Sequence, residues 1–179
     1  AAKWFSKSAE QGHADAQFHM GVCCLLGSGV KKDYVEAAKW FRKSAEQGNA
    51  RAHFNLGTCY EDGEGVKKDL AAALKCYRSA AEQGNRNAQI KLGACYANGT
   101  GVQKDYAESV KWYRTPAEQG DADAQFNMGF CCYTGNGIQK DLAEAVKWFR
   151  KSAEQGDGRA QYNLGICYEG GEGVLADKV

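Results

Sequence analysis

The chain has 179 residues, of which 44% are hydrophobic and 25% charged, and its formal net charge is +1 at pH 7. These values are ordinary for a folded protein, and the near-zero charge gives no global attraction to nucleic acid or to an anionic membrane. No apolar run approaches the roughly 18 to 20 residues that span a bilayer, so we expect no membrane-crossing helix. The sequence starts inside a helical pattern without Met, and it therefore does not indicate a compartment.

The chain repeats itself every 36 residues. A Gln-Gly pair marks the period at Gln11-Gly12, Gln47-Gly48, Gln83-Gly84, Gln119-Gly120 and Gln155-Gly156. Because stacked repeats bury a core between neighbours, the period predicts one repeat domain over residues 1–179. Its complete repeats are 13–48, 49–84, 85–120 and 121–156, flanked by the half repeats 1–12 and 157–179.

Each complete repeat begins with a predicted first helix. In the second repeat, Asn49 can cap this helix, because its side-chain oxygen can accept from the free amides of the first turn. Ala52, Leu56 and Cys59 then follow at the spacing of one helical face. Gly63 ends the helix, since glycine tolerates the left-handed conformation common at helix ends.

A second helix follows in each repeat. In three repeats its first residue is Asp and is followed three positions later by Glu, a capping-box pattern, at Asp33 and Glu36, Asp105 and Glu108, and Asp141 and Glu144. The helix of the first repeat carries Ala37, Trp40, Phe41 and Ser44 on one side and stops at Gly48. We expect aromatic residues at a fixed phase to pack between helices rather than to stack on bases or sugars.

Two residue types are unexpected inside these helices. Glycine recurs in the middle of the first helix, where it costs about 1 kcal/mol relative to Ala, at Gly21, Gly57, Gly93, Gly129 and Gly165. Close approach of another helix would explain that cost. Pro116 lies within a second helix where other repeats have Ser or Ala, and it predicts a lost hydrogen bond and a local bend.

A set of residues recurs at fixed positions in the repeats, namely Ala52, Leu56-Gly57, Tyr60, Gly63-x-Gly65-Val66, Asp69, Ala73 and the Ala-Glu-Gln-Gly that ends at Gly84. This pattern resembles the Sel-1-like repeat, a relative of the tetratricopeptide repeat, over the whole chain. The resemblance implies an all-α fold, a right-handed α-α superhelix of antiparallel helix pairs. It also implies an adaptor or scaffold in multiprotein complexes.

The eight cysteines are expected to be buried hydrophobic residues. In the cysteine-rich secreted branch of this family, disulfides join the end of a second helix to the next first helix, at positions that are Ala45 and His53 here. The cysteines that share one phase instead lie one repeat apart, at Cys23, Cys59, Cys95, Cys131 and Cys167. Neighbouring helices lie roughly 8 to 10 Å apart, whereas a disulfide needs Cα atoms within about 7 Å.

Two local patterns suggest ligands but fit them poorly. The segment 27–32, Gly-Ser-Gly-Val-Lys-Lys, resembles a phosphate loop, yet it follows a helix rather than a strand and recurs as a helix terminator. His19 and Cys23 could supply two zinc ligands, whereas zinc sites normally have three or four. We therefore predict no cofactor and no metal.

Catalysis and nucleic-acid binding also lack a pattern. The only histidines are His13, His19 and His53, and no serine or cysteine is matched with a base, so the sequence predicts no enzyme. A basic stripe on the second helices, around Lys39 and Lys43, is offset by Glu46 and its equivalents. A solvated outer face explains this stripe better than a nucleic-acid site.

The repeats differ most on one face of the first helix. The varying positions have offsets of 0, 4, 7 and 11, which fall on the side opposite the Ala, Leu and Cys face. In helix-pair solenoids the first helices line the concave surface, so these residues should line a groove. The predicted partner-binding residues are Arg51, Asn55, Thr58, Asn87, Lys91, Ala94, Asp123, Asn127, Phe130, Arg159, Asn163 and Ile166.

Two functions remain open. The first is a scaffold that binds a partner protein or extended peptide, because asparagine can both donate to and accept from a peptide backbone. The alternative is a structural spacer or self-assembling array, since the half repeats 1–12 and 157–179 could cover one another head to tail. A third hypothesis, a hydrolytic enzyme, is based only on the hydrolytic activities that have been assigned to some members of the family. The groove could also be unoccupied.

Overall fold

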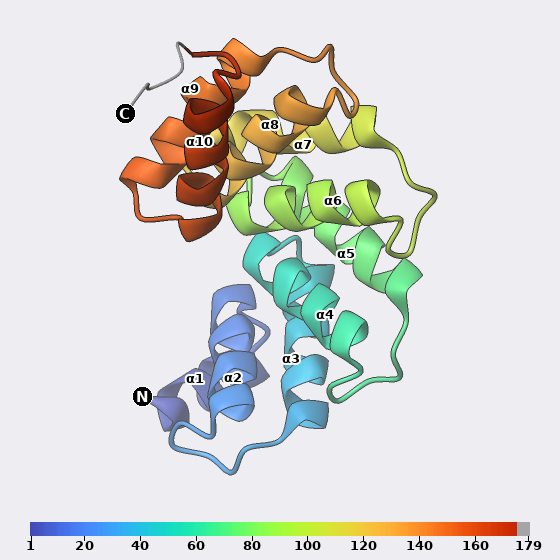
Figure 1. The fold of residues 1–179 in the computed structure, drawn as a ribbon. Helices are drawn as coiled ribbons and strands as arrows, with labels where there is room; N and C mark the ends of the chain where they lie inside the picture. Colours follow the sequence, from blue (N-terminus) through green and yellow to red (C-terminus); the bar gives the residue numbers. More distant parts are fainter. Residues whose placement is uncertain (175–179) are drawn as a thin grey trace. The chain divides into compact units, whose positions relative to one another are not determined.

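Residues 1–174 are described by the computed structural model, and over this range the chain forms ten α-helices and no strand (Figure 1). The first helices of the repeats are α2 (Ala14–Leu26), α4 (Ala50–Asp62), α6 (Arg86–Asn98), α8 (Ala122–Thr134) and α10 (Gly158–Gly170). The second helices are α1 (Ala2–Glu10), α3 (Tyr34–Glu46), α5 (Leu70–Glu82), α7 (Tyr106–Glu118) and α9 (Leu142–Glu154). The predicted alternation of first and second helices is confirmed.

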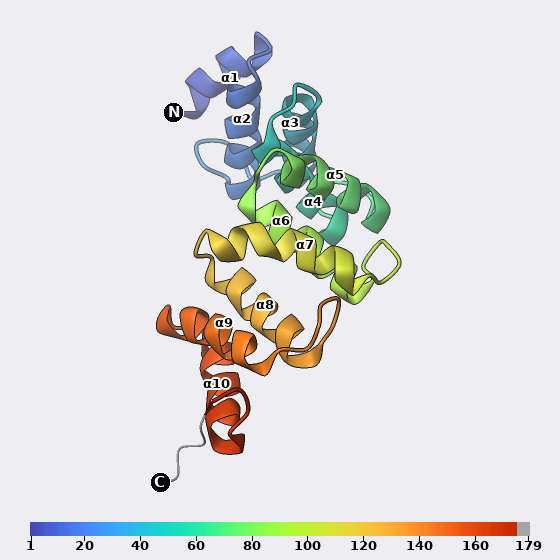
Figure 2. The same cartoon turned by 90° about the horizontal axis from the view of Figure 1, so that it is seen from above.

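The chain divides into two compact units, an N-terminal unit of Ala1–Lys91 and a C-terminal unit of Leu92–Val179. The division falls within α6. In the N-terminal unit each helix from α1 to α5 packs against the next, and in the C-terminal unit the same holds from α7 to α10 (Figure 2). A single repeat domain over residues 1–179 stays a prediction.

The ends of the helices are fixed by the predicted capping residues. Asn49 Oδ1 accepts from the amide of Ala52 at 3.1 Å, and Gly63 adopts the left-handed conformation with φ +77° at the end of α4. Asp33 Oδ1 likewise accepts from the amide of Glu36 at 3.0 Å. Each bond satisfies a first-turn donor or permits the turn that stops the helix.

The capping box is only half formed, which corrects the sequence-based expectation. In a full box the Glu side chain would accept from the amide of the capping Asp. The amide of Asp33 instead donates to the carbonyl of Cys24 at 2.9 Å, and Glu36 pairs with Lys39 at 3.0 Å. The same arrangement recurs at Asp105 and Asp141. The preceding first helix thus occupies the donor that the Glu would have used.

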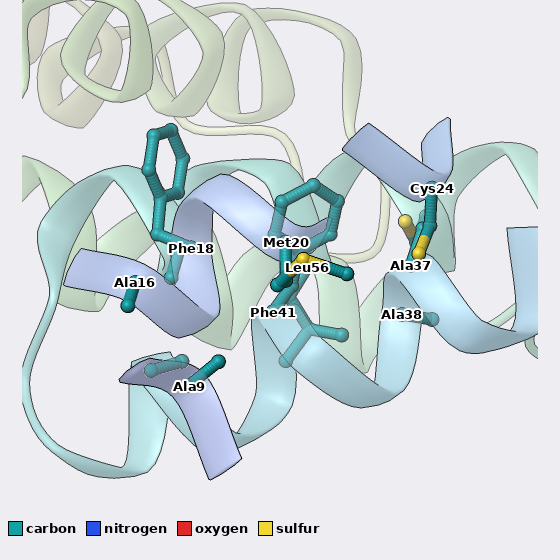
Figure 3. Close-up of a cluster of buried hydrophobic side chains, with 12 residues drawn as sticks. Ala9, Ala16, Phe18, Met20, Cys24, Ala37, Ala38, Phe41 and Leu56 are labelled. Atoms are coloured by element: carbon teal, nitrogen blue, oxygen red, sulfur yellow. The ribbon is translucent and has the colours of Figure 1, made fainter. Parts of the chain in front are cut away.

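The core of the N-terminal unit is formed by small residues around large aromatic rings. Figure 3 shows Ala9 of α1, Ala16 and Met20 of α2, Phe41 of α3 and Leu56 of α4 gathered in one cluster. In the C-terminal unit the equivalent of Phe41 is Phe149, which is also fully buried. Each second helix from α3 to α9 thus buries one aromatic ring at the equivalent position, namely Phe41, Tyr77, Tyr113 and Phe149.

These rings explain the glycines inside the first helices. A Cβ added to the glycine would lie 2.5 to 2.7 Å from the ring of the paired second helix, closer than real Cβ atoms come, in the pairs Gly21 and Phe41, Gly57 and Tyr77, Gly93 and Tyr113, and Gly129 and Phe149. The predicted close approach is therefore confirmed in these four helix pairs. At Gly165 a Cβ would meet nothing within 4 Å.

In α2, α6, α8 and α10 a glutamine hydrogen-bonds the first helix to the second helix before it. Its Nε2 donates to an alanine carbonyl eight residues earlier at 3.1 to 3.2 Å, from Gln17 to Ala9, Gln89 to Ala81, Gln125 to Ala117 and Gln161 to Ala153. Each of these helix-end carbonyls also accepts from the amide of the glycine three positions later, so the glutamine supplies its second hydrogen bond. His53 occupies this position in α4, and its Nδ1 is buried without a hydrogen-bond partner.

The cysteines are packed as expected. All eight are free thiols, and only Cys76 is more than slightly exposed. Pro116 is buried within α7. This helix is 13 residues long, like the other second helices from α3 onward. A bend at Pro116 stays a prediction.

Candidate functional site

The predicted binding residues lie on the exposed side of the first helices. None of the twelve is buried, whereas Ala52, Leu56 and Cys59 on the packing face of α4 are at most 5% exposed. Asn127 is half-buried, and Cys131 on the same helix is buried. Packing therefore occupies one face of each first helix and leaves the varying face accessible.

The outermost row of this face forms ion pairs between consecutive first helices. Arg51 Nη2 lies 3.2 Å from Asp15 Oδ1, and its guanidinium carbon lies 4.5 Å from the centre of the Phe18 ring. In the C-terminal unit Arg159 pairs with Asp123 in the same way. Arg51 was predicted to bind a partner, but in the structure it pairs with a carboxylate of its own chain.

Arg159 is held by a second carboxylate as well. It also pairs with Asp157, the residue that caps α10, and its guanidinium carbon lies 4.4 Å from the centre of the Phe126 ring. The hydrogen bond from Arg159 lowers the pKa of Asp157, and the same bond raises the pKa of Arg159. Arg159 is therefore a fixed part of the surface whose charge is largely offset.

Lys91 in the middle row is engaged by a network in the N-terminal unit. Its Nζ lies 2.9 Å from Oε2 of Glu61, and the same carboxylate accepts from the hydroxyl of Tyr77 at 2.6 Å. Burial alone would raise the pKa of Glu61, but the hydrogen bonds from Tyr77 and Lys91 outweigh it and the pKa is lowered. Lys91 was also predicted to bind a partner, but in the structure it already pairs with Glu61.

Two asparagines of the middle row, Asn127 and Asn163, use their donors within their own helices. Asn127 Nδ2 donates to the carbonyl of Asp123 at 2.9 Å, and Asn163 Nδ2 donates to that of Arg159 at 2.8 Å. Each side-chain amide is thus oriented by its helix. Its carbonyl oxygen remains able to accept from a bound peptide amide.

Four of the predicted residues line one pocket in the C-terminal unit, and these are Ala94, Asn127, Phe130 and Arg159. The pocket has a volume of about 360 Å³. Its other lining residues are Ala97, Asn98, Lys104, Tyr106, Tyr113, Cys131 and Asn136, so it lies between the end of α6, the start of α7 and the face of α8. Among residues 1–174, no Asp or Glu lines it.

This pocket is open because the side chain at position 97 is short. Ala97 is equivalent to Glu61 one repeat earlier, where the carboxylate reaches Tyr77 and Lys91. The equivalents of those two residues are Tyr113 and Asn127, and both line the pocket. Because Ala97 is short and Asn127 is shorter than Lys, the space that the ion pair fills in the N-terminal unit stays open.

The sequence-based prediction missed most of these lining residues. Lys104, Tyr106 and Asn136 lie outside the first helices, and Tyr113 was assigned only to packing. The signal that could have revealed the pocket is the series Leu25, Glu61, Ala97, Tyr133 and Glu169, in which alanine is the smallest residue.

The outer face of the second helices is largely neutralised by its own residues. Lys111 and Lys147 pair with Glu108 and Glu144 at 2.7 and 2.9 Å. Lys151 Nζ lies 4.4 Å from the centre of the Trp148 ring, which is a cation–π distance. A more open hollow of about 480 Å³ in the N-terminal unit contains none of the predicted residues and is lined by Arg42, Tyr60, Val66, Lys67, Lys68 and Asp69.

The other candidate ligand sites gain no support. In residues 1–174 no three His, Cys, Asp or Glu side chains are grouped so that they could hold a metal ion. The amides that begin the segment 27–32 are used within the chain, since Gly27 and Ser28 donate to the carbonyl of Cys23. No helix among the described residues is long and apolar enough to cross a membrane.

Comparison with solved structures places this architecture among known solenoids. The chain is 41% identical to c5321, a protective antigen of uropathogenic Escherichia coli with an SLR fold, with a TM-score of 0.95 over 99% of the chain and 38% of that protein. It is 42% identical to a Sel1 repeat protein of Oxalobacter formigenes, with a TM-score of 0.88 over 93% of the chain and 66% of that protein. The chain thus spans less than two thirds of either relative.

A third structure, cysteine rich protein B of Helicobacter pylori, is 26% identical, with a TM-score of 0.57 over 77% of the chain and 99% of that protein. No curated protein matches the chain. The predicted all-α solenoid of helix pairs is confirmed by these likenesses, and solenoids of this kind generally offer extended surfaces for protein interaction.

The family model of the Sel1 repeat matches residues 1–13, 14–49, 50–85, 86–121, 122–157 and 158–179. These matches cover the sequence from end to end, and the predicted resemblance is confirmed. The chain belongs to the Sel1 repeat family.

Proposed function

We propose that this chain is a non-catalytic scaffold that binds an extended segment of a partner protein along the exposed faces of its first helices. The observation that carries the proposal is the pocket of about 360 Å³ on that face of the C-terminal unit, which Ala94, Asn127, Phe130 and Arg159 share. A concave pocket with mixed apolar and amide walls is the usual form of a binding site.

Exposed and oriented groups on α8 and α10 support a peptide ligand. The Phe130 side chain is 44% exposed although it is large and apolar. Asn127 and Asn163 hold their side-chain amides in place by donating to their own helices, which presents their oxygens in a fixed direction. Such oxygens could accept from the amides of an extended chain whatever its sequence.

A catalytic role gains no support from the thiols. Burial raises the pKa of Cys59 and Cys131 to about 11, and the reactive form of cysteine is the thiolate. His53 is buried enough that its pKa is lowered, and its Nδ1 has no hydrogen-bond partner in the structure. A base held by no second group is poorly suited to activate a nucleophile.

Selection from a display library of random 12-residue peptides tests this proposal. Peptides enriched on the chain should lose binding to the double variant Asn127→Ala and Phe130→Ala, by roughly tenfold or more if these residues are central. The matched control carries Lys111→Ala and Lys147→Ala on the outer face of α7 and α9. Peptides that bind the first variant as well as the control would refute the proposed face.

Head-to-tail self-association is a second candidate. Trp4 on α1 and Tyr162 on α10 are 70% and 72% exposed, so each offers a large aromatic surface to a second copy. A contact that joins α10 of one copy to α1 of the next would cover both and could propagate. Light scattering across a hundredfold range of concentration, repeated with Tyr162→Ser, tests this candidate, and a constant monomer mass would dismiss it.

A further inference from the structure

The residue at one position of the first helix, Ala97 in the third repeat, determines whether the adjacent space is filled by a side chain or left open as the pocket. Leu25, in the first repeat, is half-buried and packs against the core, and Tyr133 donates from its hydroxyl to Glu172 at 2.7 Å. Glu61 reaches Tyr77 and Lys91. Ala97 has no atom beyond Cβ with which to fill the same place. The hollow is therefore a local feature of the C-terminal unit and not a general property of the repeat.

The walls of this hollow are suited to an aromatic ring. Ala94 and Ala97 are small and belong to α6, the buried ring of Tyr113 belongs to α7, and the exposed ring of Phe130 stands on α8. Aromatic rings pack favourably against one another edge to face or offset. A volume of about 360 Å³ is at the low end of the range for ligand pockets, which suits one large side chain better than a whole cofactor.

The charge of the rim favours an acidic neighbour to that ring. Lys104 forms no ion pair with any residue among 1–174, and its Nζ lies 5.5 Å from the centre of the Tyr106 ring. Arg159 is already shared by Asp123 and Asp157. Because no Asp or Glu among residues 1–174 lines the pocket, Lys104 is available to pair with an acidic group of the bound segment.

We infer that this pocket is the anchor site for one aromatic side chain of the bound segment, with an Asp or Glu next to it paired to Lys104. The inference deepens the proposed function and rests on it. It defines the partner by chemistry, as an extended segment that contains an aromatic residue beside an acidic one. The remaining contacts along the first helices then need no particular sequence.

Small probes test the pocket without any partner. N-acetyl-tryptophan carries both an aromatic ring and a carboxylate, N-acetyl-tryptophan amide lacks the charge, and N-acetyl-alanine lacks the ring. Titrated into the whole chain and followed by the methyl NMR signals of Ala94 and Ala97, the acid should bind most tightly. Its affinity should exceed that of the amide by about three- to fivefold, as expected for one exposed ion pair. Equal binding of all three probes would overturn the inference.

Substitution of the decisive residue gives the matched variant. Ala97→Leu places in the third repeat the residue that the first repeat has at Leu25, so it should fill the pocket and preserve the fold. We expect N-acetyl-tryptophan binding to fall roughly tenfold or more. Lys104→Gln should remove only the advantage of the acid over the amide. Ala71→Leu, at an exposed position of α5, is the control, and unchanged binding by Ala97→Leu with a native melting curve would contradict the anchor.

The library selection separates this inference from the proposed function. If enriched peptides bind the first-helix face but lack an aromatic residue beside Asp or Glu, the proposed binding face is supported and the inferred anchor site is contradicted. If no peptide is enriched while N-acetyl-tryptophan binds wild type and not Ala97→Leu, the anchor stands and binding of an extended segment fails. Enriched peptides with the aromatic–acidic pair that lose affinity on Ala97→Leu support both.

Discussion

The ring of Phe149 lies so close to Gly129 that a Cβ built on the glycine would come within 2.6 Å of ring carbon Cδ1. The ring is fully buried in the C-terminal core. The glycine is thus required by the approach of α8 to α9, and its low helix propensity is offset by the packing that it permits.

Gly129→Ala should therefore destabilise the chain despite the better helix propensity of alanine. Overpacking of a buried site typically costs about 1 to 3 kcal/mol, because the ring or the helix must shift. The free energy of unfolding can be measured by urea denaturation followed by circular dichroism. A midpoint equal to that of wild type would show that α8 and α9 are not locked by this contact.

Gly165→Ala is the matched substitution at the equivalent position of α10. A Cβ there would meet nothing within 4 Å, so only the gain in helix propensity remains. We expect a stabilisation of up to about 1 kcal/mol in the same assay. Destabilisation by this variant would mean that the glycine is needed for a reason other than the ring contact.

His53→Gln should stabilise the N-terminal unit. Gln17 and Gln89 at the equivalent positions donate to a helix-end carbonyl, whereas His53 leaves a buried nitrogen without a partner. One restored hydrogen bond is worth about 1 kcal/mol. Differential scanning calorimetry at pH 7.5 checks the change, and a lower melting temperature for the variant would contradict it.

The same substitution should change the pH dependence of stability. Burial lowers the pKa of His53 in the folded chain, so the unfolded chain holds the proton more tightly. Stability is then complete above the unfolded pKa of about 6.5 and is lost as the pH falls through the lower folded value. The gain from His53→Gln should be larger at pH 5 than at pH 7.5. An equal gain at both values would show that His53 does not titrate on unfolding.

Tyr77→Phe tests the hydrogen bond to Glu61. Phe41 and Phe149 occupy the equivalent positions, so the ring should pack unchanged. A bond to a charged acceptor is worth more than a neutral one, and we expect a cost of about 1 to 2 kcal/mol in urea denaturation. Tyr113→Phe is the control, because Ala97 stands where Glu61 would be, and its cost should be smaller. Equal costs for the two variants would show that the effect comes from the loss of a tyrosine hydroxyl and not from its hydrogen bond to Glu61.

The sequence predicted the features that depend on local spacing. The helix boundaries, the Asp and Gly caps and the burial of Cys59 follow from which residues recur every 36 positions. The same comparison identified the exposed face, because packing residues stay constant while surface residues vary.

The features that depend on neighbouring repeats were not predicted. The predicted capping box does not form completely, because the amide of Asp33 donates to the carbonyl of Cys24 in the preceding helix. Lys91 was assigned to a partner because its contact, Glu61, lies 30 positions earlier in the chain. The pocket was missed because its cause is an absent side chain at Ala97, and an absence shows only when the side chains around it are placed in space.

The most direct test of the binding face is an amide NMR map of the chain with a peptide from the library selection. The account predicts that the largest shifts fall on Ala94, Ala97, Asn127 and Phe130 and that the outer lysines Lys111 and Lys147 of α7 and α9 are unaffected. Shifts concentrated on those outer lysines, with the pocket unchanged, would contradict it.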